Sequence, residues 1–311
     1  MSKPLVTIIT PVYNCEKYIE QTIRSVLSQG YDRLQYIILD DGSTDGTPEI
    51  LRKYELLDNV FVDRHDNIGE ARTVNRGLRM ADGDLIAIVN ADDPLLPHCI
   101  NTMVQYAEQY PWVFVFYCDW LMINEDGDTI RTFKTFPYSY RWMIEQHYCI
   151  PGPGAFISRK AIDMAGVRPE KYTYMSDLAH WMQVGLYGDF MRVPYILATF
   201  RRSPQQQSQA KAALIVKDHI KSYEDYFKQP NVPKEINRAK SMSAAYFIAA
   251  EVSAIADDYF SAVKYTVWSA CLYPPNFVTR IFPATFGSVQ RRLMGMPIKR
   301  FHSQDTVVSH P

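Results

Sequence analysis

The chain has 311 residues, of which 47% are hydrophobic and 22% are charged. This composition excludes a disordered chain and suits a globular protein with one large domain and an appendage. The formal net charge is -1, so the overall charge gives no reason to expect nucleic acid as a partner.

The first part of the chain alternates strand-like and helix-like segments. Apolar runs at residues 5–10 and 35–40 are typical of buried strands, and residues 16–29 carry apolar side chains at helical spacing. A second helix is predicted over 47–57 and a third, short strand at 60–63. This alternation predicts an α/β protein with a mostly parallel sheet covered by helices.

Acidic residues follow two of the predicted strands. A helix that starts near Gly69 and ends before Gly83 leads into a fourth strand at 85–90. Pairs of aspartates at 40–41 and 92–93 follow the second and fourth strands. Because the C-terminal ends of parallel strands meet at one edge of a sheet, we expect a ligand site at that edge.

The parallel pattern stops after the next helix, near residue 97, and the next strand, at 112–120. Asp126 and Gly127 form a predicted hairpin turn, and residues 131–153 are aromatic and irregular. The remaining elements are a strand and helix over 155–166, a helix over 176–188, a last strand at 190–200, and an almost wholly helical pattern beyond residue 205. The sequence therefore predicts an α/β domain over 1–204 and a helical C-terminal extension over 205–311.

The stretch DDGSTDGT, residues 40–47, is the first candidate for ligand binding. Carboxylates and exposed backbone amides after a strand can bind hydroxyls and base edges. The alternative is a capped turn, in which Ser43, Thr44 or Asp45 caps the helix that begins near Pro48.

The stretch NADD, residues 90–93, is the second candidate. Asp92 and the neighbouring Asn90 offer hard oxygen ligands to Mg²⁺ or Mn²⁺. A helix cap in front of Pro94 accounts for Asp93 but leaves Asp92 unexplained.

Three arginines lie on the predicted helix between Gly69 and Gly83, namely Arg72, Arg76 and Arg79. At this near-helical spacing they can bind a diphosphate or form a solvated basic face. Arg72, nearest the helix N-terminus, is the better ligand candidate.

Four segments of the chain resemble, in order and spacing, the motifs of glycosyltransferase family 2, whose members have the GT-A fold. They are TIITPVYNCEKYIEQTIRSVLSQ, IILDDGSTDGT, NIGEARTVNRGLRMADGDLIAIVNADD and SDLAHWMQVGLYG. The resemblance runs from about residue 6 to residue 208 and does not reach the helical extension. It implies a Rossmann-like sheet with a donor half over 1–96 and an acceptor half over 97–204.

The resemblance also implies roles for individual residues. Asp41, the second acid of the turn, would contact the nucleotide base, and Asp92 would bind the metal and the donor diphosphate. The position two residues before Asp92 is Asn90 where the family has an aspartate, so one negative charge fewer is available to a metal. The full set of donor-binding candidates is Pro11, Tyr13, Asn14, Glu16, Asp41, Gly69, Arg72, Asn90 and Asp92.

Asp177 is the candidate catalytic base, because it matches the family's acid four residues before Trp181. A carboxylate there could take a proton from an acceptor hydroxyl. The alternative is that Asp177 or Ser176 caps the helix. After the last strand the family often has an arginine and then a histidine; this chain has Arg201 and Arg202, with Ser203 in place of the histidine.

The end of the chain is basic and aromatic. Residues 260–304 contain no acid, and Lys264, Arg280, Arg291, Arg292, Lys299 and Arg300 lie among large apolar side chains. This pattern indicates peripheral contact with an anionic membrane surface or, equally, a helix packed on the domain with a solvated basic face.

The location is expected to be cytoplasmic, with peripheral contact at the inner face of the membrane. The five cysteines are scattered and odd in number, which favours a reducing compartment. Apolar runs such as 112–118 and 244–250 are shorter than the roughly 20 residues of a membrane-spanning helix. Two prolines interrupt the apolar residues of the N-terminus, so a signal peptide is not expected.

The function expected from the resemblance is transfer of a sugar from a nucleotide-diphosphate donor, a UDP-sugar, to an acceptor hydroxyl with inversion. The implied cofactor is Mg²⁺ or Mn²⁺, and the implied partners are the donor and a saccharide or lipid-linked acceptor in cell-surface polysaccharide or glycolipid synthesis. The alternative from another class is a non-catalytic nucleotide-sugar-binding or scaffold protein, for which Asn90 and Ser203 are the only support.

Overall fold

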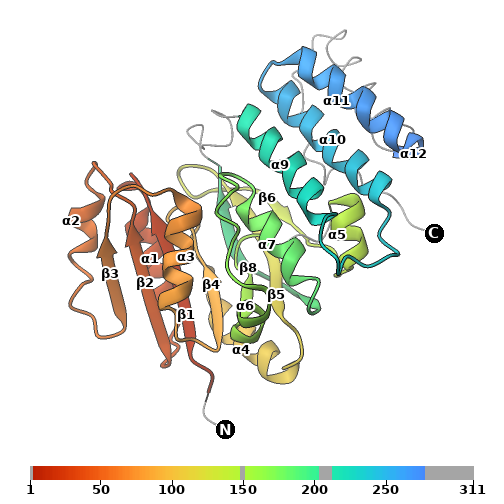
Figure 1. Ribbon diagram of the computed structural model, residues 1–311. Coiled ribbons are helices and arrows are strands. Elements are labelled where there is room, and N and C mark those ends of the chain that lie inside the picture. Colours follow the sequence, from red (N-terminus) through yellow and green to blue (C-terminus); the bar gives the residue numbers. More distant parts are fainter. Residues whose placement is uncertain (1–2, 148–150, 203–211, 277–311) are drawn as a thin grey trace. The chain divides into compact units, whose positions relative to one another are not determined.

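The computed structural model describes residues 3–147, 151–202 and 212–276 (Figure 1). It divides into two compact units. The sheet unit comprises residues 1–138 and 149–204, and the helical unit comprises residues 139–148 and 205–311. The predicted spans 1–204 and 205–311 differ from these units at residues 139–148. The division of the first span into a donor half and an acceptor half stays a prediction.

The sheet unit is built on one mixed, mostly parallel sheet, as the sequence predicts. Its strands are β1 (Val6–Val12), β2 (Leu34–Asp40), β3 (Val60–Arg64), β4 (Leu85–Ile88), β5 (Val115–Ile123), β6 (Thr129–Phe133), β7 (Phe156–Ser158) and β8 (Phe190–Arg201). The strand order is β3-β2-β1-β4-β7-β5-β6, and β8 pairs with β5. Strands β3, β2, β1 and β4 are mutually parallel, and β7 runs antiparallel to both β4 and β5.

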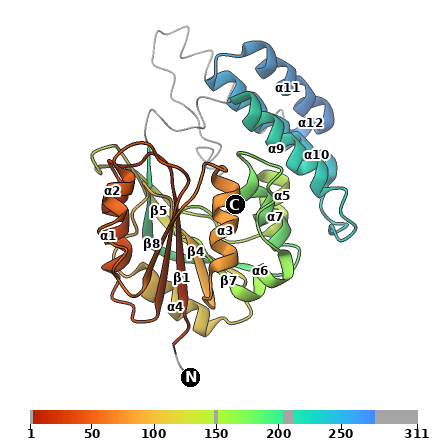
Figure 2. The ribbon, with the colours of Figure 1, turned by 60° about the vertical axis from the view of Figure 1, so that its left-hand side comes forward.

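Helices cover both faces of this sheet (Figure 2). They are α1 (Ile19–Leu27), α2 (Thr47–Leu51), α3 (Glu70–Met80), α4 (Cys99–Gln109), α6 (Arg159–Ala165) and α7 (Ser176–Val184). On one face residues of α1, α4 and β1 share a hydrophobic cluster, in which α4 packs against β5 and β8. On the other face α3 packs against β1 and β2. Gly77 allows the close approach of α3, because a Cβ there would lie 2.5 Å from Ile9 Cγ2. All seven residues of β1 are buried, as expected of a central parallel strand.

The second helix is much shorter than predicted. It ends at Leu51, whereas the apolar pattern continues to Leu57. Beyond Leu51 this segment has little surface to pack on, since Leu56 is 93% exposed. A short helix without a buried face is not stable, so the chain continues as turns.

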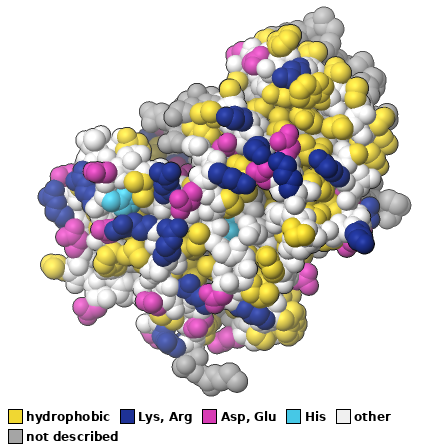
Figure 3. Space-filling view, viewed as in Figure 1, with side chains coloured by type: hydrophobic (Ala, Val, Ile, Leu, Met, Phe, Trp, Pro, Cys, Tyr) yellow, Lys and Arg dark blue, Asp and Glu magenta, His cyan; other side chains and the backbone are white. Residues whose placement is uncertain are grey.

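The helical unit contains α5 (Tyr140–Gln146), α9 (Ala212–Tyr226), α10 (Arg238–Ile255), α11 (Tyr259–Leu272) and α12 (Pro274–Asn276). Helix α10 packs on α9, α11 and α5. The side chains of Ser243 and Ser269 hydrogen-bond each other at 3.0 Å where α10 meets α11. Apolar side chains gather over α10 and α11 in Figure 3. Among the residues that the structure describes, no helix has the length and apolar character needed to span a membrane.

Helix α5 was not predicted, because residues 131–153 read as irregular. Ser139 caps it by accepting the Trp142 N–H. Its buried Glu145 accepts the Asn237 N–H at 2.8 Å and lies 3.1 Å from Lys240 Nζ. The helix therefore depends on partners far along the chain, and its local sequence carries only a weak signal.

Candidate active site

The ends of β1, β2 and β4 lie side by side at one edge of the sheet. Val12 pairs with Asp40, and Ile9 pairs with both Ile37 and Ile88 in neighbouring parallel strands. The loops that follow these strands carry most of the predicted donor-binding residues. This edge is therefore where the candidate site is built.

The loops after β1 and β2 are joined by hydrogen bonds. Asn14 has a left-handed backbone, with φ of 47°. Its N–H donates to Ser43 Oγ at 2.9 Å, and its Oδ1 accepts the Thr44 N–H at 2.8 Å. Glu16 Oε2 accepts the Gly46 N–H at 2.6 Å. The side chains of Asn14 and Glu16, predicted as donor ligands, therefore also hold the two loops together.

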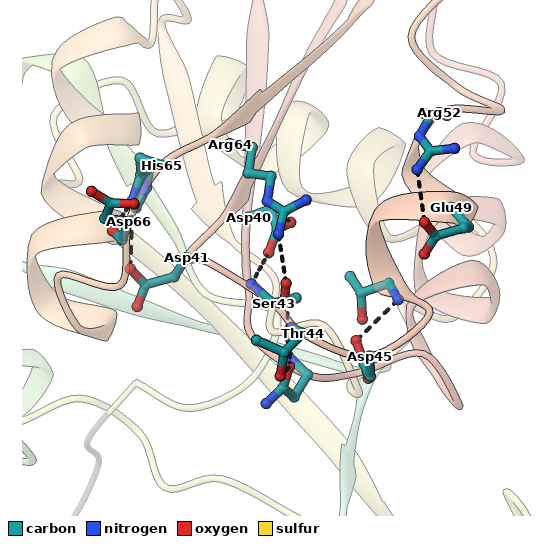
Figure 4. A network of polar contacts seen from close by, with 12 residues as sticks. Asp40, Asp41, Ser43, Thr44, Asp45, Glu49, Arg52, Arg64, His65 and Asp66 are labelled. Atoms are coloured by element: carbon teal, nitrogen blue, oxygen red, sulfur yellow. Dashed lines mark hydrogen bonds and ion pairs between the residues drawn. The ribbon is translucent and has the colours of Figure 1, made fainter.

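The DDGSTDGT turn is held by its own acids (Figure 4). Asp40 is buried; its Oδ1 accepts the Ser43 N–H at 2.9 Å, and its Oδ2 lies 3.5 Å from Arg64 Nε. Asp45 Oδ1 accepts the Thr47 N–H at 3.0 Å at the start of α2. The N-cap of α2 is Gly46 and no side chain caps the helix, so Asp45 binds the first helical N–H without being the cap that the alternative predicted.

Asp41 organises the loop after β3. Its side chain is buried, and its two oxygens accept the N–H groups of Ile68 at 2.6 Å and Gly69 at 3.0 Å. His65 Nδ1 lies 3.5 Å from the same carboxylate (Figure 4). The structure therefore brings two predicted donor-binding residues, Asp41 and Gly69, into direct contact.

Tyr13 and Pro11 stand at the end of β1. Pro11 is buried in the strand, whereas Tyr13 is 45% exposed and offers an aromatic ring at the edge of the sheet. Cys15, next along this loop, lies close enough to other acids at the edge for their charges to act on its thiol. Burial and then the charges of Asp92 and Asp45 raise the pKa of its thiol to about 12, which disfavours the reactive thiolate.

In the NADD stretch, the two aspartates Asp92 and Asp93 have different surroundings. Asp92 is half-buried, and desolvation raises the pKa of its carboxyl. Asp93 is buried and accepts the Arg201 N–H at 2.7 Å and Asn90 Nδ2 at 3.0 Å. The prediction that Asp93 caps a helix is wrong, because the next helix begins at Cys99. Asp93 instead ties the end of β4 to the end of β8.

Arg201 is fully enclosed in the sheet unit. Its guanidinium donates to the carbonyl oxygens of Asp92, Asn124 and Glu125 and to Gln21 Oε1, at 2.7 to 3.0 Å. It also lies 4.4 Å from the centre of the Tyr18 ring. Arg201, the last residue of β8, therefore supports the loops of the site from inside.

The arginines of α3 form ion pairs with acids at the surface. Arg76 pairs with Asp63, and Arg79 lies 3.1 Å from Glu170. Arg72 is 62% exposed, with Nε 3.7 Å from the same Glu170. Such exposed pairs are weak, so Arg72 can leave Glu170 for a phosphate group at little cost in free energy.

Asp177 lies in the first turn of α7 with its side chain exposed. The helix is preceded by Met175, which makes no side-chain cap, and Asp177 Oδ1 accepts the adjacent Leu178 N–H at 2.7 Å. Asp177 and Asp92 both act on the charge of Glu70, the first residue of α3. Asp177, the candidate base, and Asp92, on the candidate diphosphate side, thus both lie close enough to Glu70 to affect its charge.

Two residues near the site were missed by the sequence predictions, Glu70 and Arg168. Arg168 Nη1 lies 3.8 Å from Glu70 Oε1. The available signal for Glu70 was an acid in the first helical turn directly after Gly69, where acids also occur simply to offset the helix dipole. No local pattern singles out Arg168.

His180 on α7 is buried, and its titration tests how the helix that carries Asp177 is anchored. Desolvation, assisted by the Arg168 charge, lowers its pKa to about 4, from 6.5, and Nε2 lies 2.8 Å from the Gly166 carbonyl oxygen. The unfolded chain therefore binds one more proton between these values, and the free energy of unfolding falls as the pH drops from 6.5 towards 4.

Replacing His180 with glutamine is expected to remove about 1.4 kcal/mol per pH unit from that slope. Urea unfolding followed at several pH values measures it. His98→Gln, at an exposed position, is the matched control and should keep the wild-type slope. A slope unchanged in His180→Gln would show that this ring is not held neutral.

The residues at the edge fit a divalent ion that takes some of its oxygen ligands from the protein and the others from a diphosphate. Among the residues that the structure describes, no three His, Cys, Asp or Glu side chains gather where they could hold a metal by themselves. Asn90 donates its Nδ2 to Asp93, which leaves its Oδ1 available next to Asp92. One carboxylate and one amide oxygen match the few protein ligands that Mg²⁺ takes beside phosphate oxygens.

Comparison with known protein families identifies the family to which this sequence is similar. The profile described as Glycosyl transferase family 2 matches residues 7–164. TuaG of Bacillus subtilis, named a putative teichuronic acid biosynthesis glycosyltransferase, is 35% identical over 139 residues, which are 44% of this chain and 55% of TuaG. An uncharacterized glycosyltransferase of Haemophilus influenzae is 26% identical over 289 residues, 86% of this chain and 89% of that protein. The chain spans about half the length of TuaG.

Solved structures show the same fold. The mannosyltransferase PcManGT of Pyrobaculum calidifontis, in complex with GDP-Man and Mn²⁺, superimposes with a TM-score of 0.61 at 18% identity, covering 94% of this chain and 86% of that one. TarS 1–349 of S. aureus, in complex with UDP-GlcNAc, gives a TM-score of 0.59 at 15% identity, covering 86% of this chain and 91% of that one. These superpositions confirm the predicted GT-A fold.

Proposed function

The chain belongs to glycosyltransferase family 2, and on this basis we propose that it transfers a sugar from a UDP-sugar to an acceptor hydroxyl with inversion. The observation that carries the proposal is the sheet edge, where the loops after β1, β2 and β4 bring Tyr13, Asp41 and Asp92 to one side. The UDP-GlcNAc complex of TarS supports a uridine donor, and the name of TuaG supports a role in the synthesis of a cell-surface polymer.

The proposed reaction is a single displacement. Asp177 removes the proton from the acceptor hydroxyl, whose oxygen forms a bond to the anomeric carbon of the donor sugar. The bond from that carbon to the diphosphate oxygen breaks, and its electron pair leaves with the diphosphate. Attack from the face opposite the leaving group inverts the anomeric centre. The exposed carboxylate of Asp177 is open to an acceptor, as this role requires.

Asp92 and Asn90 would hold a Mg²⁺ or Mn²⁺ ion at the diphosphate, as the edge geometry allows. Such an ion supplies positive charge where negative charge develops on the leaving group. Arg72 can add a bidentate contact to the same diphosphate. Tyr13, with its exposed ring, would contact the base, and the joined loops around Asn14 and Glu16 would form the nucleoside side.

Binding of UDP, GDP and TDP by calorimetry, with and without Mn²⁺, tests the donor class. Wild-type protein is expected to bind UDP most tightly. Mn²⁺ is expected to strengthen that binding by roughly tenfold, because Asp92 would hold the ion and its positive charge would attract the diphosphate. Asp92→Ala should lose the effect of Mn²⁺. Asp32→Ala, an exposed acid before β2, is the matched control and should keep it. Failure of the wild type to bind any of the three nucleotides would favour the scaffold alternative.

We also propose peripheral contact with an anionic membrane and, through it, a lipid-linked acceptor. Most of the basic segment, residues 277–304, lies outside the described residues. Helix α11 precedes it and exposes apolar side chains one helical turn apart, with Phe260 83% and Val263 64% exposed beside Lys264. Apolar groups flanked by cations suit the interface of an anionic bilayer.

Sedimentation with phosphatidylglycerol vesicles tests this contact. Replacing Arg291 and Arg292 together with glutamine should weaken binding by roughly 30-fold, at about 1 kcal/mol for each charge. The control pair Arg24→Gln and Lys53→Gln removes two exposed charges from the sheet unit. Equal binding by wild type, variant and control would remove the membrane proposal.

A further inference from the structure

Glu70 has a fixed place at the edge of the sheet. It is the first residue of α3, directly after Gly69, whose φ of 87° lets the loop turn into the helix. The Gly69 N–H is held by Asp41 at 3.0 Å. The position of Glu70 is therefore set by the same acid that organises the nucleoside side of the site.

Arg168 is fixed on the other side of Glu70 by a second set of contacts. Asn75, fully buried on α3, donates Nδ2 to the Arg168 carbonyl oxygen at 2.8 Å and accepts the Arg168 N–H at 3.0 Å. This pair of bonds ties the loop between α6 and α7 to the face of α3. The loop leads directly into the helix that carries Asp177.

The guanidinium of Arg168 is buried but incompletely satisfied. The side chain is 9% exposed, and Nε has no hydrogen-bond partner among the residues that the structure describes. Its Nη1 lies 3.8 Å from Glu70 Oε1, within reach of an ion pair but beyond a hydrogen bond. A buried donor without a partner costs free energy, so the unpaired Nε of Arg168 calls for an explanation.

The carboxylate of Glu70 is placed to accept hydrogen bonds from a ligand. Its side chain is 63% exposed, and its one described ion pair, with Arg168, is too long to occupy its oxygens. Desolvation by surrounding groups raises the pKa of this carboxyl, Arg168 lowers it, and the charges of Asp177 and Asp92 raise it. Glu70 therefore lies within electrostatic reach of both the candidate base and the candidate diphosphate side.

We propose that Glu70 binds hydroxyl groups of the transferred sugar and determines which sugar is accepted, with Arg168 as the positioning residue that holds its carboxylate. The inference rests on the proposed function, because it assigns a specificity role within that site. An ionised carboxylate accepts two hydrogen bonds from vicinal hydroxyls, and their geometry differs between sugar epimers. The positive charge of Arg168, 3.8 Å from Glu70 Oε1, would favour the rotamers that keep the carboxylate near it.

Calorimetry with UDP alone and with UDP-glucose, UDP-galactose and UDP-GlcNAc separates the sugar from the nucleotide. Glu70→Gln keeps the shape of the side chain and removes its charge. We expect it to weaken binding of the preferred UDP-sugar by about tenfold, the loss of a charge-assisted hydrogen bond, and to change UDP binding by less than about twofold. Glu49→Gln on α2, at an acid that is 61% exposed and paired with Arg52, is the matched control.

Arg168→Met tests whether Arg168 positions the Glu70 carboxylate. The measured quantity is the ratio of affinities for two UDP-sugars, which a loss of stability alone would not change. We expect it to narrow the affinity ratio between UDP-glucose and UDP-galactose while UDP binding is kept, and Arg168→Lys to restore part of that ratio. If Arg168→Met fails to fold, Glu70→Gln still decides the question. Equal losses for UDP and UDP-sugars in Glu70→Gln, or no loss for either, would overturn the inference. A wild type that binds no nucleotide would instead remove the proposed function, and the inference with it.

Discussion

Replacing Asp177 with asparagine is expected to lower the rate of sugar transfer about 10²–10⁴-fold, the usual contribution of a positioned general base. Asparagine keeps the size of the side chain but cannot take the proton of the acceptor hydroxyl. Asp177 is exposed in the first turn of α7 and forms no helix cap, so the substitution should leave the fold unchanged. Donor affinity should change by less than about twofold, because this carboxylate is proposed to act on the acceptor.

The measurement is product formation from a UDP-sugar, with nucleotide binding followed in parallel by calorimetry. Asp163→Asn, at an exposed acid on α6, is the matched control and should transfer sugar at the wild-type rate. Full activity in Asp177→Asn would place the base elsewhere. A wild type that binds the donor but never turns it over would support the scaffold alternative.

Replacing Arg201 with methionine is expected to lower the free energy of unfolding by about 3–5 kcal/mol, the usual cost of removing one partner from a buried charged network. The guanidinium donates to three carbonyl oxygens and to Gln21, and all four acceptors would lose that bond inside the sheet unit. Its charge also lowers the pKa of the buried Asp93 carboxyl, which burial and then the charge of Asp92 raise.

Urea unfolding of the full chain measures this loss. Arg24→Met is the matched control, because Arg24 is 72% exposed and its ion pair with Glu20 is expected to contribute only about 0–1 kcal/mol. A loss in Arg201→Met no larger than that in the control would mean that water replaces the guanidinium at its acceptors.

The backbone of the site could be predicted from the sequence, because its signals are local. Continuous apolar runs followed by acids identify β2 and β4, and the position of Gly69 marks the start of α3. The partners of the side chains could not be predicted in the same way. Asp93 was read as a cap because Pro94 follows it, whereas its carboxylate accepts the N–H of Arg201, 108 residues away.

Glu70 and Arg168 are a second case in which the partners of side chains could not be predicted from the sequence. Each is unremarkable in its own segment, and they are brought together by Asn75, whose contacts with Arg168 span 93 positions. Helix α5 was missed for a related reason, since its buried acid finds its partners in a distant helix. Contacts of this range depend on how the elements pack, which periodicity and turn residues do not encode.

The dependence of α5 on α10 also has a consequence for how the protein is made. Glu145 and Asn237 are 92 positions apart. At a synthesis rate of about 5–20 residues per second, α5 leaves the ribosome roughly 5–18 s before its partner exists. During that interval the strands on both sides of α5 can pair, while α5 itself must wait with a carboxylate and an apolar face uncovered. Nascent chains should therefore pass through a state in which the sheet is formed and α5 is open to chaperones or proteases.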